Sequence, residues 1–297
     1  MKLLCATDLL PKSDAAVDRA FQLRDALNAR LTLLHVVAPG GAEKGTLEQR
    51  LLAASSRLAM RARHSGPGVE LVVRCGRPTS VAAEEARNAN LAIVGPHFPS
   101  ALMDALRGQF VERLLGDAKC PVLVTRRPGR EIYRNFLLAV DGSPSTAGVI
   151  RMAERLPVAP DAQLAVVHAH EPPYEAMMSS VGVGNLSVAR YASASMSQAA
   201  AMISAELELH SRHRHRYRVL LMDSRPGTAI RHAIQQTGAE LLVIGTRGHG
   251  RFRRALLGST AHEVLNTTDC DVLLVPEAGP RGKQPLRDDP PPPPMAA

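Results

Sequence analysis

Short apolar segments alternate with segments of helical periodicity through the first part of the chain. The apolar segments, which we expect to be β-strands, span residues 2–7, 31–37, 69–74, 91–94 and 121–125. Between them, apolar positions recur at helical spacing in residues 13–27, 47–62, 79–88 and 109–115. Strands that alternate with helices are typical of an open parallel sheet with helices on both faces. We therefore predict an α/β domain of five parallel strands over residues 1–127.

The same order of elements returns in the second part of the chain. We expect strands at residues 136–140, 163–169, 217–222, 240–244 and 271–275. Helices are expected at 144–156, at 187–210, at 227–236 and from a glycine-rich segment to 265, with a long loop at 170–186. These elements predict a second five-stranded domain over residues 134–277. The proline-rich segment 278–297 is expected to be a disordered tail, because five consecutive prolines cannot pair in a sheet.

The two halves can be compared residue by residue, because a shift of 150 positions aligns Leu91 with Leu241. The shift needs no gap as far as Leu123 and Leu273. Two copies of one domain are therefore predicted. The last strand of each copy is apolar and is expected at a sheet edge, where unpaired backbone groups favour pairing. We predict that the copies form an internal pseudo-dimer through these strands, at 122–125 and 272–275, and a homodimer is left open.

A glycine-rich segment lies between the strand at 240–244 and the last helix. Gly245, Gly248 and Gly258 can take positive φ and leave space for an anion beside backbone N–H groups. Ser259 or Thr260 can act as the N-cap of the helix, which brings a hydroxyl group to the positive helix end. This arrangement suits phosphate groups, and basic side chains are supplied at positions 247, 249, 251, 253 and 254.

The same segment also has an ordinary structural interpretation. Thr260 and Glu263 have the spacing of a capping box at the start of a helix. Short glycine patterns are weak signals when they are considered without their structural context. The residues alone therefore leave the phosphate site and the simple glycine turn as alternatives.

The spacing Gly-x2-Gly-x9-Gly-Ser after a buried strand resembles the nucleotide-binding signature of the universal stress protein family. The resemblance covers nearly the whole chain except the tail. It implies flavodoxin-like sheets of the adenine nucleotide alpha hydrolase-like type, and binding of ATP, with or without Mg²⁺, without a well-defined reaction. The implied nucleotide-binding residues are Ala139, Val140, Asp141, Ala169, Ile244, Gly245, Arg247, Gly248, Gly258, Ser259 and Thr260.

Within this implied site, Asp141 would hydrogen-bond the adenosine, and Ala139, Val140 and Ala169 would line it. In an open parallel sheet the ligand crevice lies at the carboxyl ends of the strands, where the strand order reverses. In the second half the expected strands end at Asp141, Ala169 and Gly245, so these residues all reach that edge. The alternative for Asp141 is a simple turn residue, because the sequence Asp-Gly-Ser-Pro favours a turn.

The first half has lost most of the phosphate-binding residues. The shift of 150 places Phe98 at the position of Gly248, Gln109 at that of Ser259 and Phe110 at that of Thr260. Prolines at 96 and 99 also remove backbone N–H donors. Asp8 matches Asp141, so weak contact with a nucleoside is left open in this half. We predict one ATP, bound in the second half only.

Composition and charge narrow the classes of protein to which the chain can belong. The chain has 45% hydrophobic residues and 3% aromatic residues, so its cores must be built from aliphatic side chains. No apolar run reaches the roughly 20 residues that span a bilayer. Four scattered cysteines suggest neither a disulfide framework nor a metal site, and we expect a cytoplasmic protein. The net charge of +8 suggests nucleic acid, but few aromatics are available for stacking, so no specific nucleic-acid partner is expected.

The histidines and cysteines have structural interpretations that we favour. Alternation with arginine suggests a solvated basic helix end for the histidines at 210, 213 and 215, of which 210 and 213 would share a helical face. His35 and His168 lie at equivalent strand positions and are expected to be satisfied core histidines. Cys120 and Cys270 are also equivalent, which favours a packing role over redox chemistry.

The sequence contains no set of nucleophile, base and acid at the expected crevice. We therefore expect no enzyme activity beyond slow ATP hydrolysis. The main hypothesis is a nucleotide-sensing stress protein whose partner is an adenine nucleotide. The alternative is a scaffold or interaction protein in which the crevice is vestigial. ATP-dependent adenylyl or redox chemistry on a similar sheet is disfavoured by the missing catalytic set.

Overall fold

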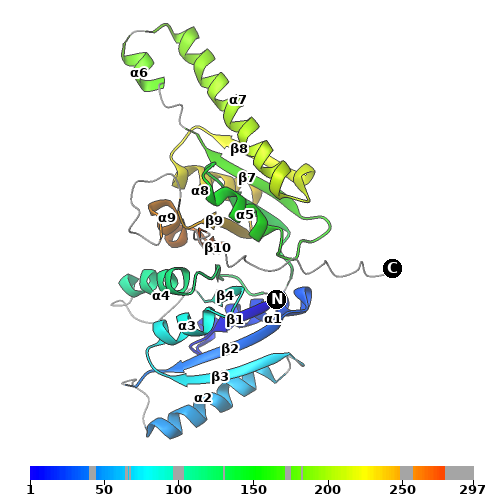
Figure 1. Cartoon of the computed structure of the whole chain (residues 1–297), viewed down its shortest axis with the longest axis vertical. Coiled ribbons are helices and arrows are strands. Elements are labelled where there is room, and N and C mark those ends of the chain that lie inside the picture. The colour runs from blue at the N-terminus through cyan, green and yellow to red at the C-terminus, as the bar shows by residue number, and fades with distance from the viewer. Residues whose placement is uncertain are drawn as a thin grey trace.

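The computed structural model of the protein describes residues 1–39, 45–63, 66, 68–95, 104–129, 131–170, 175–181, 183–247 and 257–277. The predicted tail at 278–297 lies outside the described residues. Ten strands form one sheet in the order β3-β2-β1-β4-β5-β10-β9-β6-β7-β8 (Figure 1). They are β1 (Lys2–Ala6), β2 (Arg30–Val37), β3 (Val69–Cys75), β4 (Leu91–Val94), β5 (Val122–Val124), β6 (Asn135–Ala139), β7 (Gln163–Ala169), β8 (Tyr217–Met222), β9 (Leu241–Gly245) and β10 (Asp271–Val275).

The strands are parallel within each half, and the predicted α/β fold is confirmed. The halves are not two separate sheets, because β5 and β10 pair in antiparallel orientation with Leu123 opposite Leu273. Each half has its first and fourth strands as neighbours, so the strand order reverses between β1 and β4 and between β6 and β9. These two points are where ligands are bound in open α/β sheets.

Helices cover both faces of the sheet, as the alternation of elements predicts (Figure 1). One core cluster contains side chains from α1, α2, α5 and α7, and the other contains side chains from α3, α4, α8 and α9. The helices are α1 (Asp14–Leu27), α2 (Leu47–Ala62), α3 (Pro78–Ala86), α4 (Asp104–Asp117), α5 (Ser145–Ala153), α6 (Glu175–Ser180), α7 (Asn185–His210), α8 (Pro226–Thr237) and α9 (Ser259–Thr267). Both clusters draw residues from both halves, so the cores continue across the β5–β10 seam.

Two helices differ from the sequence-based expectation. α6 lies within the segment 170–186, which lacks a helical apolar pattern and was expected to be a loop. α4 begins at Asp104 rather than near 109. Figure 1 shows α6 and the outer end of α7 projecting at one end of the molecule, while β3 and α2 lie at the other. No helix in the described ranges is long and apolar enough to cross a membrane.

A buried polar cluster ties the segment between the halves to β10. The Asp271 carboxylate is fully buried and accepts hydrogen bonds from the backbone N–H groups of Arg126 (2.6 Å) and Arg127 (3.1 Å). The Tyr133 hydroxyl donates to the same carboxylate at 2.5 Å. Burial, followed by the charge of Asp271, raises the pKa of Tyr133 well above its usual value, so the hydroxyl remains a donor.

Arg19 on α1 supplies the positive charge of this cluster. Its Nε lies 3.5 Å from Asp271 Oδ2, a distance that favours Coulombic attraction over a well-formed hydrogen bond. Its Nη1 donates to the Glu131 carbonyl at 2.8 Å, and its guanidinium carbon lies 3.9 Å from the Tyr133 ring centroid. The cluster therefore joins α1, the connecting segment and β10.

Three cysteines are buried in the core, as the packing interpretation of Cys120 and Cys270 requires. Burial raises the pKa of Cys5 and of Cys120 to about 12, and it also raises the pKa of Cys270. These thiols are protonated near neutral pH and are poor nucleophiles. Cys75, at the end of β3, is exposed.

Candidate functional site

A cavity of about 1270 Å³ opens at the carboxyl ends of β6 and β9, where the strand order of the second half reverses. It is the position at which the sequence predicts a ligand. Every predicted site residue that the structure describes lines this cavity, namely Ala139, Val140, Asp141, Ala169, Ile244, Gly245, Arg247, Gly258, Ser259 and Thr260. Gly248 lies outside the described residues, so its predicted role stays a prediction.

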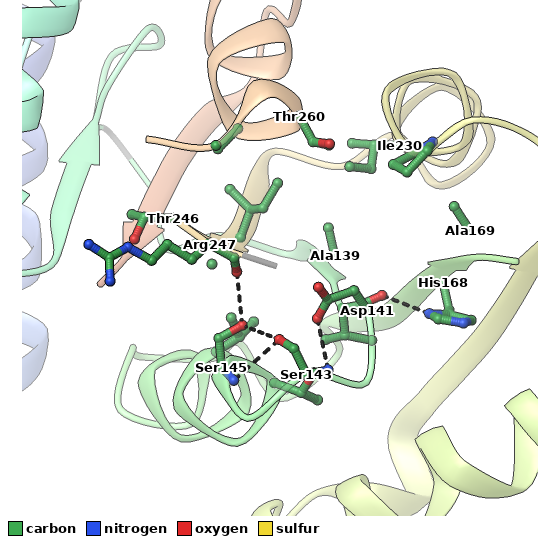
Figure 2. Close-up of a pocket in the computed structure, with 18 of the residues that line it drawn as sticks. Ala139, Asp141, Ser143, Ser145, His168, Ala169, Ile230, Thr246, Arg247 and Thr260 are labelled. Atoms are coloured by element: carbon green, nitrogen blue, oxygen red, sulfur yellow. Dashed lines mark hydrogen bonds between the residues drawn. The ribbon is translucent and has the colours of Figure 1, made fainter. Parts of the chain in front are cut away.

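The cavity lies between two groups of residues that differ in chemistry. Figure 2 shows Ala169 and His168 at one end and Thr246 and Arg247 at the other. Asp141 lies on the wall between these ends, and Thr260 faces it from the opposite wall (Figure 2). Ala169 and Ile230 are apolar residues at one end of the cavity, and Arg247 places a cation at the other (Figure 2).

A tight turn after β6 positions Asp141. Its Oδ1 accepts a hydrogen bond from the Ser143 backbone N–H at 3.0 Å, as expected for an Asp-Gly-Ser-Pro turn. Gly142 has a φ of +75°, and a Cβ there would lie 2.5 Å from the Met202 Cε atom. The turn and the cavity wall are the same structure, so the two interpretations of Asp141 do not exclude each other.

Hydroxyl groups at the start of α5 form a part of the site that sequence reasoning missed. Ser143 Oγ and Ser145 Oγ are 2.7 Å apart, and Thr146 Oγ1 accepts from the Gly142 N–H at 3.1 Å. Ser145 Oγ also donates to the Arg247 carbonyl at 3.1 Å (Figure 2). The signal was the run of hydroxyl residues at 143, 145 and 146 directly after the predicted carboxylate.

The glycines at the cavity do not have the predicted backbone conformation. Gly245 and Gly258 are not among the residues with positive φ, so that part of the prediction is wrong. Close packing explains them instead. A Cβ at Gly245 would lie 3.0 Å from Ser145 Oγ and 3.3 Å from the Arg247 carbonyl oxygen, and one at Gly258 would lie 3.2 Å from the Thr246 carbonyl oxygen. A side chain at either site would require these neighbouring atoms to shift.

The start of α9 also differs from its prediction. Gly258 is the N-cap residue, with φ −67° and ψ 160°, and the helix begins at Ser259. Ser259 and Thr260 therefore lie in the first turn rather than at the cap. The alternative interpretation, a capping box at Thr260, is wrong, because Gly258 is the N-cap residue and no side-chain hydrogen bond caps the helix. Glu263 instead forms an ion pair with Arg231 of α8. N–H groups in the first turn of a helix have no intrahelical acceptor, and here this turn lines the cavity.

Arg247 is paired with an acidic residue that sequence reasoning missed. Its Nη1 lies 3.3 Å from Glu277 Oε2, and both side chains are partly exposed. Glu277 follows β10 and lines the same cavity. Because β9 and β10 are parallel neighbours, their following residues leave the sheet at the same edge. A carboxylate is thus held beside the cation at the polar end of the cavity.

The strand histidines are satisfied as expected. His168 is buried and its Nδ1 lies 2.9 Å from the Val140 carbonyl oxygen, while His35 Nδ1 lies 2.9 Å from the Thr7 carbonyl oxygen. His213 is not on the α7 face of His210, because α7 ends at His210, and His213 Nδ1 lies 3.0 Å from Glu154 Oε2. Among the described residues, no three potential ligands gather as a metal site would require.

The first half has the same turn with different side chains. Asp8 Oδ1 accepts from the Leu10 N–H at 2.9 Å, and Leu9 has a φ of +61° where the second half has Gly142. Phe110, at the position of Thr260, is buried in the core. The segment 96–103 lies outside the described residues, so its predicted effect is untested. In this half Leu10 and Lys12 replace Ser143 and Ser145, while Ser13 keeps a hydroxyl group at the position of Thr146.

This combination defines an open α/β protein with a tandem domain and a cavity at a strand-order reversal. The sequence matches the model of the universal stress protein family over residues 1–126 and 132–276. The chain belongs to this family.

Relatives agree with the tandem arrangement. The protein "Universal stress protein in QAH/OAS sulfhydrylase 3'region" of Thermus aquaticus is 33% identical over 144 residues, which are 48% of this chain and 99% of that protein. Universal stress protein YxiE of Bacillus subtilis is 21% identical over 147 residues, again 48% of this chain and 99% of that protein. Each relative corresponds in length to about half of this chain.

Solved structures resemble the chain over nearly its whole length. A universal stress protein from Archaeoglobus fulgidus has a TM-score of 0.64 at 17% identity and covers 93% of this chain and 96% of its own. A putative universal stress protein from Pseudomonas aeruginosa has a TM-score of 0.63 at 23% identity and covers 93% and 92%. At these identities the likeness is one of fold.

Proposed function

We propose that this universal stress protein binds one adenine nucleotide, with ATP as the preferred ligand, in the cavity of its second half. One observation carries the proposal. The residues expected at the adenosine end, such as Asp141 and Ala169, line the same cavity as Gly258 and Ser259, expected at the phosphate end. The cavity volume of about 1270 Å³ is ample for a ligand of this size.

The two ends of the cavity would hold different parts of the ligand. The base would lie against the apolar end at Ala169, and the Asp141 carboxylate would accept hydrogen bonds from ribose hydroxyl groups. The phosphates would meet the first turn of α9, the Ser259 hydroxyl and Arg247, which together supply N–H donors and positive charge. Mg²⁺, where present, would enter with the phosphates, since it is usually held by substrate oxygens and water.

We also propose that the protein is not an enzyme beyond slow hydrolysis. Three described cavity-lining residues have proton-transfer chemistry, and each has another partner. His168 Nδ1 is close to the Val140 carbonyl, Glu277 pairs with Arg247, and Asp141 Oδ1 accepts from the Ser143 N–H of its own turn. A general base must reach the proton that it removes. A binding role in the cytoplasm, with occupancy as the signal, fits these residues better than turnover.

The first test is calorimetric titration of the full chain with ATP. Asp141→Ala is expected to weaken ATP binding about tenfold to 150-fold, because a hydrogen bond to a charged group contributes about 1.5–3 kcal/mol. Asp8→Ala is the matched control, since it removes the equivalent turn carboxylate from the first half. It should leave ATP affinity and a stoichiometry of one unchanged.

Three outcomes would contradict the proposal. Absence of ATP binding by the unmutated protein, together with no nucleotide released on denaturing it, would favour the vestigial crevice of a scaffold protein. Two equivalent sites would show that the first half retains a complete site. Loss of ATP binding in both aspartate variants would indicate that the conformations of the two turns, rather than the Asp141 carboxylate in the cavity, determine ATP affinity.

A second prediction concerns the carboxylate at the polar end. Glu277→Gln is expected to strengthen ATP binding by up to about fivefold, because a partly exposed charge pair contributes about 0.2–1 kcal/mol and Arg247 would be released to the phosphates. Adenosine, which has no phosphate, is the matched control ligand and should bind with unchanged affinity. Weaker binding of Mg·ATP by the variant would instead assign Glu277 a role in holding the metal.

A further inference from the structure

The strand β3 lies at one end of the sheet order, so among the described residues it has β2 as its one strand partner. The Leu31 N–H donates to the Gly68 carbonyl and the Gly76 N–H to the Val37 carbonyl, both at 3.1 Å. In this parallel register the backbone groups of the even-numbered residues 70, 72 and 74 face β2. The backbone groups of residues 69, 71, 73 and 75 therefore point away from the sheet.

We propose that a second copy of this chain pairs with β3, in antiparallel orientation, about a two-fold axis at Val72. In this register Leu71 lies opposite Val73 of the second copy, and Val69 lies opposite Cys75. Both pairs consist of residues whose N–H and C=O groups point outward, so they can exchange hydrogen bonds. The result would be a sheet that continues from one molecule into the next.

Charge complementarity selects the second copy as the partner. The proposed register places Glu70 directly opposite Arg74 of the second copy, and the two-fold axis generates this pair twice. Both side chains are exposed and lie on the same face of β3 as Val72. Opposite charges that face each other across antiparallel strands are stabilising, and like charges are destabilising. Arg74 already lies 2.7 Å from Glu85 and could pair with Glu70 from its other side.

Other registers and the other sheet edge are less suitable. An axis at residue 70 or 74 would place Glu70 opposite Glu70 or Arg74 opposite Arg74, and an axis at 71 or 73 would leave both charges without an opposite charge. At the other end of the sheet, β8 has a single charged residue, Arg218, so self-pairing there forms no ion pair within the strand. Charges on edge strands usually prevent pairing, and here they permit one register.

Exposed apolar side chains near this edge support an interface. Leu71 on β3 is 42% exposed although it is a leucine in a strand. Helix α2 packs on β3 (Figure 1). On this helix Leu52 is 70% exposed and Met60 is 64% exposed. This surface lies at the opposite end of the molecule from α6 (Figure 1). It belongs to the first half, whereas the cavity is lined by residues of the second half, so the inference does not depend on the proposed ligand.

A charge-exchange experiment on the full chain tests the register. Sedimentation velocity should show a dimer whose dissociation constant rises about tenfold or more in Glu70→Arg, because two attractive pairs become two repulsive ones. The double variant Glu70→Arg with Arg74→Glu should restore the dimer, since it exchanges the charges within each pair. A monomeric unmutated protein, or a dimer that Glu70→Arg leaves unchanged, would overturn the proposal.

A cross-linking experiment tests the position of the axis independently. Residues directly opposite in a non-hydrogen-bonded antiparallel pair have Cα atoms about 4.5 Å apart, within the range for a disulfide. In a Cys75→Ser background, Val72→Cys is therefore expected to form a covalent dimer under mild oxidation. Leu71→Cys is the matched control and should cross-link poorly, because its own copy is displaced along the strand. Cross-linking of the control in preference to Val72→Cys would place the axis elsewhere and contradict the proposal.

Discussion

Replacement of Leu273 by lysine is expected to unfold the chain or to separate its halves. Leu273 is completely buried and lies opposite Leu123 in the antiparallel β5–β10 seam. Loss of a buried leucine costs about 2–5 kcal/mol, and an unpaired ammonium group there adds a desolvation cost of several kcal/mol more. The sum is comparable with the total stability of a typical domain, about 5–15 kcal/mol. Urea unfolding followed by circular dichroism measures the change in the free energy of unfolding.

The control for this change is the same substitution at an exposed leucine. Leu209 on α7 is 74% exposed, so Leu209→Lys should change the free energy of unfolding by no more than about 0.5 kcal/mol. A folded Leu273→Lys protein with nearly unchanged stability would mean that β5 and β10 do not pair in solution. The predicted pseudo-dimer would then be wrong.

Asp271→Ala is expected to destabilise the folded chain by about 3–5 kcal/mol. The substitution leaves the buried Arg19 guanidinium without its charge partner and removes the acceptor for two backbone N–H groups and for Tyr133. Removal of one member of a buried ion pair has a cost of this size, because the remaining charge stays desolvated. Denaturant unfolding monitored by circular dichroism gives the free energy directly.

Asp269→Ala provides the comparison for Asp271. Asp269 is exposed, two residues earlier in the chain, and its replacement should cost no more than about 0.5 kcal/mol. If Asp271→Ala costs as little as Asp269→Ala, the cluster of Arg19, Tyr133 and Asp271 does not contribute to stability. Asp271→Asn, which keeps an acceptor but removes the charge, would separate the hydrogen bonds from the ion pair.

Much of the fold can be predicted from the sequence because buried parallel strands appear in it as continuous apolar runs. The expected strands at 163–169, 217–222 and 271–275 agree with β7, β8 and β10 at both ends. Helix α6 was not predicted, because its six residues offer too little periodicity to distinguish a helix from a loop. Whether β5 and β10 join in one sheet depends on tertiary contact, although their apolar edges indicated that they could pair.

The candidate site was predictable in position and less so in detail. Strand ends fix where Asp141 and Gly245 lie, and strand ends follow from the apolar pattern. Ser259 reaches the same cavity at the start of α9. The reason for the glycines was misjudged, because the close approach of Ser145 to Gly245 comes from packing between α5 and β9. Asp271 could not be found by comparing the halves, since the equivalent residue of the first half is Pro121.

The seam between β5 and β10 gives the first half a structural role that requires no ligand. Every residue of β10 is buried, and in a solitary second half this strand would be an apolar edge with free backbone groups. Such an edge would pair nonspecifically with strands of other chains. Because β5 belongs to the same chain and pairs with β10, the first half covers this edge in every molecule. Its own crevice could therefore lose phosphate-binding residues while its last strand remained indispensable.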